Sequence, residues 1–317
     1  MRRVAKFIGG TALGFGLVAG SNKILRQDSA QIDPPLGRQQ ETYRWRGFDI
    51  AYTEAGDPSN PDLLLLHGVS AVGSSHEFRY CIDALVEDFH IIAPDMPGFG
   101  HSDRPPLLYS SSLYVSFITD IIRDLVDNPT IVGVSLTGGY CALATAETTE
   151  PVNDLYLVCP TTDIMGDPQP FARALLRSPV LGEAFFNLIV SKPAIRYFLA
   201  DHGFADKHAI PQEWVDYDWH ISHQSGSRFA PASFLTGYLN LDIDLADTLA
   251  GVSSPVTLIW GSEVTSAPLE IGKTMAESAD VRLLCFDNTA LLPHVEHPRE
   301  FVALLQGENE PYQKQTV

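Results

Sequence analysis

A serine among small residues is the feature of this 317-residue sequence best suited to chemistry. Ser135 stands in the run GVSLTGG (133–139), between the apolar stretch TIVGV and a predicted helix at 136–148. A serine at a tight turn from strand to helix needs small neighbours, because the backbone must bend there without clashes. Gly133 meets that demand. Ser135 is therefore a candidate nucleophile presented at the end of a strand.

Two further motifs precede that run. His67-Gly68 follows a row of leucines, and DMPGFGHS (95–102) follows FHIIAP. In this order the three motifs resemble those of capped α/β-hydrolases, which include meta-cleavage-product hydrolases, epoxide hydrolases, haloalkane dehalogenases and many esterases. The resemblance covers nearly the whole chain beyond residue 42. It implies a nucleophile elbow at Ser135 and an oxyanion hole formed by the backbone N–H groups of Val69 and Leu136.

The resemblance also exposes departures from the usual pattern. In these relatives the catalytic acid follows the strand that here ends in LIWG, and the corresponding position in this chain, the acid seat, is Val264. The position of Pro268 supports this alignment. Their catalytic histidine lies in a run of the type Gly-His-x-Pro-His-x-Glu-x-Pro. The matching run here is ALLPHVEHP (290–298), in which Leu291 occupies the position of that histidine, the histidine seat. A degenerate triad is implied. Thr137 occupies a position that is usually glycine, and it adds a hydroxyl to the turn.

Neighbouring residues are candidates for the missing roles. Glu263 adjoins the acid seat, and Asp163 follows DLYLVCP, where some hydrolases carry their acid. His294 lies three residues beyond the histidine seat, which is about 4.5 Å along a helix or about 10 Å in an extended loop. A general base must come within about 3 Å of the serine oxygen. His294 therefore needs a reshaped loop to act as the base, and His297 is a weaker candidate.

Five residues of the segment EWVDYDWHISHQSGSRF (213–229) have two interpretations. They either line a substrate pocket or belong to an amphipathic helix that exposes polar groups: Tyr217, His220, His223, Arg228 and Phe229. Trp219 is expected to pack this segment onto the core. His67 and His101 are expected to make structural hydrogen bonds. A serine at position 135 argues against dehalogenase or epoxide-hydrolase chemistry, because those relatives use aspartate there.

The apolar runs indicate an α/β fold with a doubly wound, mostly parallel sheet. An antiparallel pair around Gly47 is predicted to precede it. The predicted strands are 63–68, 89–95, 130–135, 154–160, 255–261 and 281–287. The predicted helices are 74–86, 112–127, 136–148, 269–278 and 298–305.

The interval from residue 161 to 250 is far longer than a crossover helix needs. Its apolar residues recur at helical spacing, so it is predicted to be a helical cap over the carboxyl ends of the strands, where open α/β sheets bind ligands. The hydrolase core is then 43–160 and 251–317, and the polar residues 28–42 are predicted to form a tether.

The first 27 residues carry five bases and no acid around the uncharged run FIGGTALGFGLVAG. That run has the length of a signal-peptide core and is short for a spanning helix. The segment is predicted to be a membrane anchor or an export signal, and the protein to be membrane-anchored or exported.

Charge narrows the possible partners. The formal net charge of the chain is -18, so residues 28–317, without those five bases, carry -23. Such a surface repels nucleic acid, and it suits a protein that stays hydrated at high salt. The four cysteines lack close pairing and are interpreted as small buried hydrophobes, so no metal or other cofactor is expected.

Three functions remain open from the sequence. The first is a serine hydrolase that acts on a small apolar ester or related carbonyl substrate, with Ser135 as the nucleophile and an unorthodox base. The second is a catalytically silent family member that binds a small apolar ligand or a partner. A cofactor-free lyase or isomerase that uses the oxyanion hole without acylation is a third reading. The site, not the fold, must decide between them.

Overall fold

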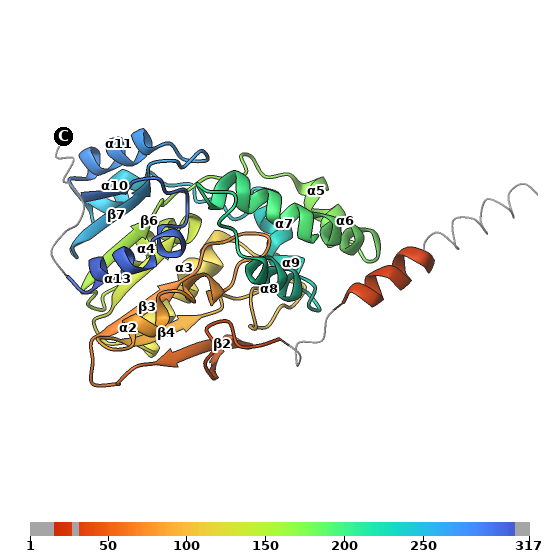
Figure 1. Cartoon of the computed structure of the whole chain (residues 1–317), viewed down its shortest axis with the longest axis horizontal. Helices are drawn as coiled ribbons and strands as arrows, with labels where there is room; N and C mark the ends of the chain where they lie inside the picture. The colour runs from red at the N-terminus through yellow and green to blue at the C-terminus, as the bar shows by residue number, and fades with distance from the viewer. Residues whose placement is uncertain (1–15, 27–31, 308–317) are drawn as a thin grey trace, which may run out of the picture.

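The apolar runs pair into one eight-stranded sheet in the computed structural model, which describes residues 16–26 and 32–307 (Figure 1). The strand order is β1-β2-β4-β3-β5-β6-β7-β8. The strands β3 to β8 are parallel, while β2 is antiparallel to both of its neighbours. The strands are β1 (Gln40–Trp45), β2 (Phe48–Ala55), β3 (Asp62–Leu66), β4 (His90–Pro94), β5 (Thr130–Val134), β6 (Asp154–Val158), β7 (Val256–Gly261) and β8 (Arg282–Phe286).

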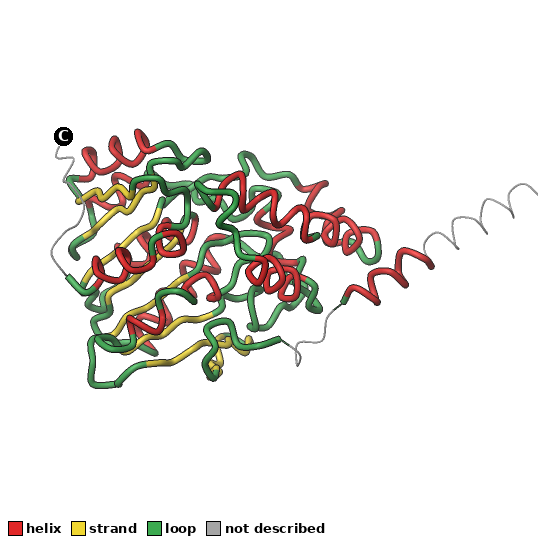
Figure 2. The backbone as a smooth tube through the Cα atoms, viewed as in Figure 1, coloured by secondary structure: helices red, strands yellow, loops and turns green. Residues whose placement is uncertain are grey.

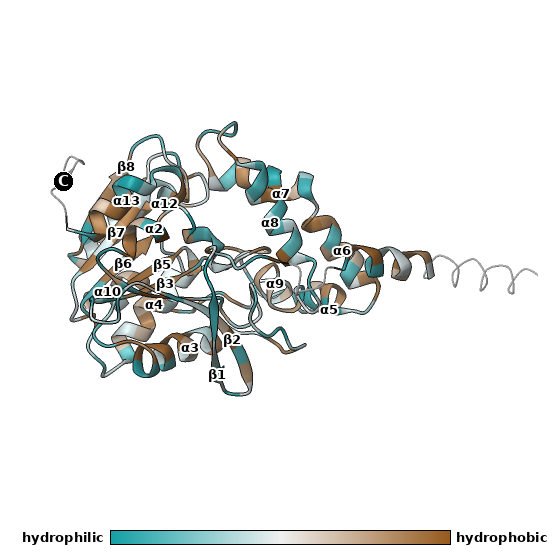
Figure 3. Ribbon diagram, turned by 60° about the horizontal axis from the view of Figure 1, so that its bottom comes forward, coloured by the Kyte–Doolittle hydropathy of each residue, from teal (hydrophilic) through white to brown (hydrophobic). Residues whose placement is uncertain are grey.

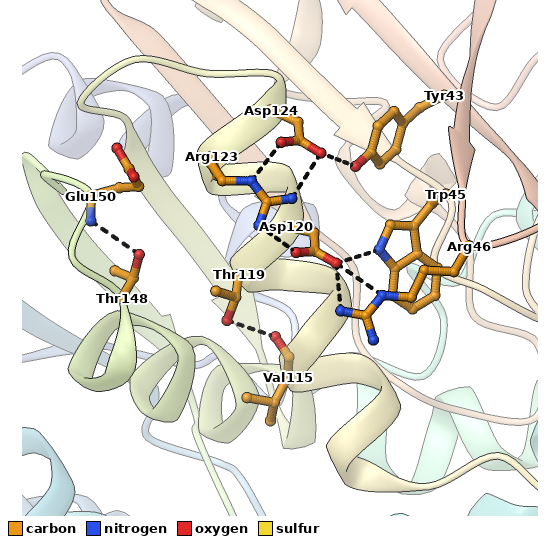
Figure 4. Close-up of polar contacts among 10 residues, drawn as sticks. All are labelled: Tyr43, Trp45, Arg46, Val115, Thr119, Asp120, Arg123, Asp124, Thr148 and Glu150. Atoms are coloured by element: carbon orange, nitrogen blue, oxygen red, sulfur yellow. Dashed lines mark hydrogen bonds and ion pairs between the residues drawn. The ribbon is translucent and has the colours of Figure 1, made fainter.

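The β1–β2 hairpin turns at Arg46 and Gly47, as the sequence predicted. Both residues have positive φ, 45° and 94°, which suits the two-residue turn that joins twisted strands. The hairpin is tied to α3 (Ser111–Asp124) through Asp120, whose Oδ2 accepts hydrogen bonds from Trp45 Nε1 at 2.8 Å and from Arg46 Nη2 at 2.8 Å (Figure 4). These contacts fix the edge of the sheet.

Alternate residues of the strands face opposite sides of the sheet, and helices cover both sides (Figure 2). Leu64 and Leu66 pack with α3 and α4 (Leu136–Glu147), whereas Leu63 and Leu65 pack with α2 (Ile82–Leu85) and α13 (Pro298–Leu305). Figure 3 accordingly shows much of the hydrophobic colour on the central strands, whereas the β1–β2 hairpin carries more of the hydrophilic colour. The predicted doubly wound α/β-hydrolase fold is confirmed.

Ten further elements lie within residues 32–307. The predicted helix at 74–86 is split into η2 (Ser75–Phe78) and α2. Between β6 and β7 lie α5 (Pro170–Arg177), α6 (Leu181–Ile189), α7 (Lys192–Phe198), η3 (Leu199–Gly203), α8 (Gln212–Ser222), α9 (Phe229–Phe234) and α10 (Leu245–Ala250). Two more flank β8, α11 (Leu269–Ala279) and α12 (Pro293–Glu296).

The helices α5 to α9 gather on one side of the sheet, beyond the carboxyl ends of its strands (Figure 1). Phe186, Ile195 and Trp214 form a separate apolar cluster that also contains Leu292 and Val295 from the chain after β8. The residues that follow the last strand therefore pack against this helical insertion.

The prediction of a membrane-anchored or exported protein is contradicted. Within residues 16–26 and 32–307, no helix has the length and apolar character needed to cross a membrane. Residues 16–25 are helical and bond to the insertion: Asn22 Nδ2 donates to the carbonyl of Val180 at 2.8 Å, and Arg26 pairs with Glu183 at 2.8 Å. Residues 1–15, which hold much of the uncharged run, lie outside the described part.

Candidate functional site

Ser135 forms the turn between β5 and α4. Its φ of 55° and ψ of -127° are strained for a residue with a side chain, and its N–H donates to the carbonyl of Val158 at 2.8 Å. Gly133 makes the turn possible, because a Cβ there would lie 2.6 Å from Cys141 Sγ. The turn thus has the geometry of a nucleophile elbow, and Ser135 retains 8% of its exposed surface.

Thr137 uses the hydroxyl that distinguishes it from the usual glycine. Its Oγ1 donates to the main-chain carbonyl of His67 at 2.8 Å, and its side chain is fully buried. This bond holds the elbow against the segment that follows β3. The imidazole of His67 accepts from the Met96 N–H at 3.0 Å and faces the Gly68 carbonyl at 3.0 Å, a structural role.

The two amides expected to form the oxyanion hole lie in these adjoining segments. Leu136 begins α4, and Val69 follows His67-Gly68; both side chains are buried. Within the described residues, neither N–H has a hydrogen-bond acceptor. The N–H of Leu136 is one of the free donors at a helix N-terminus, where partial positive charge favours an anionic oxygen.

The expected acid and base seats are apolar and packed. Val264 lies after β7, is 6% exposed and belongs to the cluster around Trp260. Leu291 lies after β8 and packs against that cluster and against the helical insertion, while its N–H donates to the His202 carbonyl at 3.3 Å. Neither side chain can accept a proton.

His294 is buried in the core. Its side chain is fully buried between Phe78 and Phe301, and its Nε2 lies 3.2 Å from Glu77 Oε1. No hydrogen bond links it to Ser135 in the described chain. Its assignment as the base stays a prediction, and it requires the imidazole to leave Glu77.

The two alternative acids also lie apart from Ser135. Glu263 is exposed, and its carboxylate accepts from Ser262 Oγ at 3.3 Å. Asp163 is exposed as well, and its Oδ1 accepts from Gly166 N and Asn240 Nδ2. Neither carboxylate contacts Ser135 or an imidazole among the hydrogen bonds of the described residues.

Two acids with little exposed surface, Glu77 and Asp218, were not singled out from the sequence. Glu77 accepts from the Gly68 N–H at 3.1 Å through its second oxygen, which places this carboxylate beside the oxyanion segment. Asp218 in α8 is 4% exposed; burial, reinforced by the charge of Glu77, raises the pKa of its carboxyl well above the usual range. Both are directly adjacent to aromatic residues in the sequence, and this adjacency was the only sequence feature that could have indicated their burial.

The described residues form no metal-binding cluster, and the Cys81 thiol is buried. In residues 16–26 and 32–307, no three His, Cys, Asp or Glu side chains are placed to hold a metal ion. Burial raises the pKa of the Cys81 thiol to about 12, so it remains protonated; its Sγ donates to the His294 carbonyl.

Comparison with known proteins agrees with the fold. The model of the alpha/beta hydrolase family matches residues 63–304. An uncharacterized hydrolase of Bacillus subtilis is 23% identical over 72% of this chain and 82% of its own length. An uncharacterized hydrolase of Saccharomyces cerevisiae is 51% identical, but over only 19% of this chain and 20% of its own length.

Many solved structures are similar, and two of them are hydrolases that match most of the chain. A serine hydrolase involved in carbazole degradation has a TM-score of 0.69, with 19% identity over 85% of this chain and 98% of its own. A meta-cleavage product hydrolase has a TM-score of 0.67, with 22% identity over 84% of this chain and 97% of its own. At such identity these likenesses show the fold alone.

Proposed function

The chain belongs to the alpha/beta hydrolase family, and on that premise we propose that it hydrolyses esters or related carbonyl substrates with Ser135 as nucleophile and without a histidine base at the usual seat. The strained elbow is the observation that carries the proposal. A non-glycine residue held at φ 55° and ψ -127° costs about 1–3 kcal/mol, and a glycine would relieve this strain. A serine kept there is best explained by use of its hydroxyl.

The proposed reaction has two steps. Ser135 Oγ attacks the carbonyl carbon, its proton passes to water or hydroxide, and the carbonyl oxygen becomes an oxyanion between the N–H groups of Val69 and Leu136. When the oxyanion collapses, the alkoxide of the substrate leaves and takes a proton from water. A second water then attacks the acyl-serine and releases the carboxylic acid, and Ser135 regains its proton.

The expected rate is low. Losing the histidine of a working triad costs a factor of about 10⁶ in turnover, and the oxyanion hole with binding leaves about 10³–10⁴ over water. A serine without a base stays a neutral alcohol of ordinary reactivity. We therefore expect the rate to rise about tenfold per pH unit, following hydroxide, with no plateau near neutral pH.

Hydrolysis of 4-nitrophenyl butyrate by the wild type and by Ser135→Ala tests the proposal. We expect Ser135→Ala to lower the enzyme-dependent rate, leaving only the part that comes from the oxyanion hole and binding, while Ser278→Ala, an exposed serine of α11, leaves the rate unchanged. Equal rates for the wild type and Ser135→Ala would contradict the proposal.

A silent, ligand-binding protein is the second candidate. One observation favours it. The positions expected to hold the acid and the histidine of the triad carry the apolar residues Val264 and Leu291, and both are packed into apolar clusters. A small apolar ligand would then occupy the region above Ser135. Tight binding of 4-nitrophenyl butyrate without any Ser135-dependent hydrolysis would support this candidate over the first.

A further inference from the structure

Three buried hydrogen-bond donors lack acceptors where the helical insertion meets the core. They are His76 Nδ1, Arg104 Nη2 and the Tyr217 hydroxyl, and none has a partner within the described residues. Buried polar atoms in folded proteins are nearly always paired, so a group of unpaired donors requires an explanation. A cluster of donors without acceptors is complementary to an acceptor that comes from outside the chain.

The three donors come from different elements that meet. The Tyr217 ring of α8 stacks on the His76 ring of η2, with centroids 3.9 Å apart and planes 7° from parallel. Arg104 follows β4 and interacts electrostatically with Tyr217. The loop before α9 packs against Arg104, because a Cβ on Gly226 would lie 2.5 Å from the Arg104 carbonyl oxygen.

The protonation states make all three groups donors. Arg79 Nη1 lies 2.9 Å from His76 Nε2, so Nε2 accepts and the proton of the neutral ring is on Nδ1. Burial, with Arg79 nearby, lowers the pKa of His76 to about 3 and keeps the ring neutral. Burial lowers the pKa of Arg104 to about 10, so its guanidinium stays charged.

Tyr217 also keeps its proton. Burial, with Asp95 and Asp218 nearby, raises the pKa of its hydroxyl well above the usual value. The Ser74 hydroxyl approaches Tyr217 without hydrogen-bond geometry. The phenolic O–H therefore remains available as a donor at neutral pH.

Neighbouring acids do not take these donors. Asp95 is fully buried, and its carboxylate already accepts from Ser75 N, Ser75 Oγ and His101 N at 2.7, 2.8 and 2.7 Å. Asp218 is kept neutral by burial, and Asp103 Oδ2 accepts from the Asp49 N–H at 2.9 Å. Arg104 is therefore a positive charge without a hydrogen-bonded counter-ion.

We propose that His76, Arg104 and Tyr217 form a binding site for a carboxylate, and that the substrates of this protein are esters which carry a free carboxylate. A carboxylate matches the planar fork of a guanidinium and accepts several N–H and O–H donors at once. The net charge of -18 repels anions at long range, so an anionic ligand needs such a local cation.

This substrate class rests on the proposed function, because the ester is the bond that Ser135 is proposed to cleave. The segment 67–77 connects the two sites: Val69 of the oxyanion segment lies near its start and His76 near its end. Its ends are held together by the hydrogen bond from the Gly68 N–H to Glu77 Oε2. A ligand can thus place its carbonyl at one end and its carboxylate at the other.

Binding is measured separately from catalysis by using 4-phenylbutyrate and its uncharged analogue 4-phenylbutyramide on Ser135→Ala. Calorimetry should show the carboxylate binding about tenfold or more tightly than the amide, because charge-assisted hydrogen bonds are the strong ones. Arg104→Met should remove that preference for the carboxylate, and Arg104→Lys, which keeps the positive charge, should retain part of it. Arg299→Met, an exposed arginine of α13, is the matched control and should keep the preference.

Equal affinity for the two compounds, no measurable binding of either, or a preference unchanged by Arg104→Met would each overturn the proposal. Circular dichroism of each variant checks that it is folded, and Tyr217→Phe gives a second, isosteric test that should weaken carboxylate binding. Hydrolysis is read separately: if 4-phenylbutyrate binds through Arg104 but no ester is cleaved, the binding site stands and the proposed function fails.

Discussion

The imidazole Nε2 of His294 lies 3.2 Å from Glu77 Oε1, and the other oxygen of Glu77 accepts from the Gly68 N–H. The helix α12, which contains His294, is thereby joined to the segment that follows β3. Both groups are buried or nearly so, with side-chain exposures of 0% and 13%. His294 is accordingly engaged in the core, next to the elbow segments but not bonded to Ser135.

His294→Gln should destabilise the protein without removing its ester hydrolysis. The substitution removes the contact between His294 Nε2 and the Glu77 carboxylate and leaves a polar group of the core without that partner, which costs about 1–3 kcal/mol. Urea unfolding measures the loss of stability, and the rate of 4-nitrophenyl butyrate hydrolysis per folded molecule measures chemistry. A folded His294→Gln variant as inactive as Ser135→Ala would identify His294 as the base.

Rebuilding the triad should raise the rate. Leu291→His alone should restore little activity, since the new imidazole would lack an orienting acid. Combined with Val264→Asp, the pair supplies a proton acceptor and the group that fixes its tautomer, so we expect a larger gain, on the order of tenfold or more over either single variant. A double variant no faster than Leu291→His would argue against the assignment of these two seats.

Stability should depend on salt. Residues 28–317 carry -23, and self-repulsion of that charge is screened only when ionic strength is high. Thermal melts over a salt series should show the midpoint rising towards molar salt. A midpoint that stays flat from low to molar salt would refute this expectation.

Asp218→Asn should stabilise the protein at neutral pH. Burial raises the pKa of Asp218 in the folded state, so the native protein holds a proton that the unfolded chain releases above its ordinary pKa of about 4. Stability from this group is complete below that pH and is lost as the pH rises towards the folded pKa.

Asparagine is neutral in both states and removes the effect. Melting temperatures of the wild type and Asp218→Asn should therefore agree near pH 4 and separate as the pH rises, by about 2 °C for each kcal/mol. A difference that is constant over this range would indicate a packing effect instead.

The sequence predicted those features that depend on local pattern. The strands, the turn at Gly47 and the elbow at Ser135 follow from apolar runs and from glycines that only a tight turn explains. The prediction of one helix at 74–86 was wrong in part. The long-range hydrogen bonds from Ser75 to Asp95 and from Gly68 to Glu77 hold residues 75–78 in the separate short helix η2. Local helical pattern cannot register such tertiary contacts.

The site could be predicted only as far as its main-chain motif. Ser135, Val69 and Leu136 are specified by neighbours in the sequence, and the structure brings their segments together through the Thr137 hydroxyl. The pairing of His294 with Glu77 joins residues far apart in the chain, so no spacing rule reveals it. The stacking of Tyr217 on His76 was beyond reach for the same reason.

The central claim is that Ser135 is a nucleophile that lacks a histidine base. Labelling with a fluorophosphonate, followed by mass spectrometry of the Ser135 peptide, tests it most directly. The account predicts an adduct on Ser135 whose rate of formation rises about tenfold per pH unit and is unchanged in folded His294→Gln. Absence of an adduct on Ser135, or a rate that reaches a plateau near neutral pH and is abolished in His294→Gln, would contradict it.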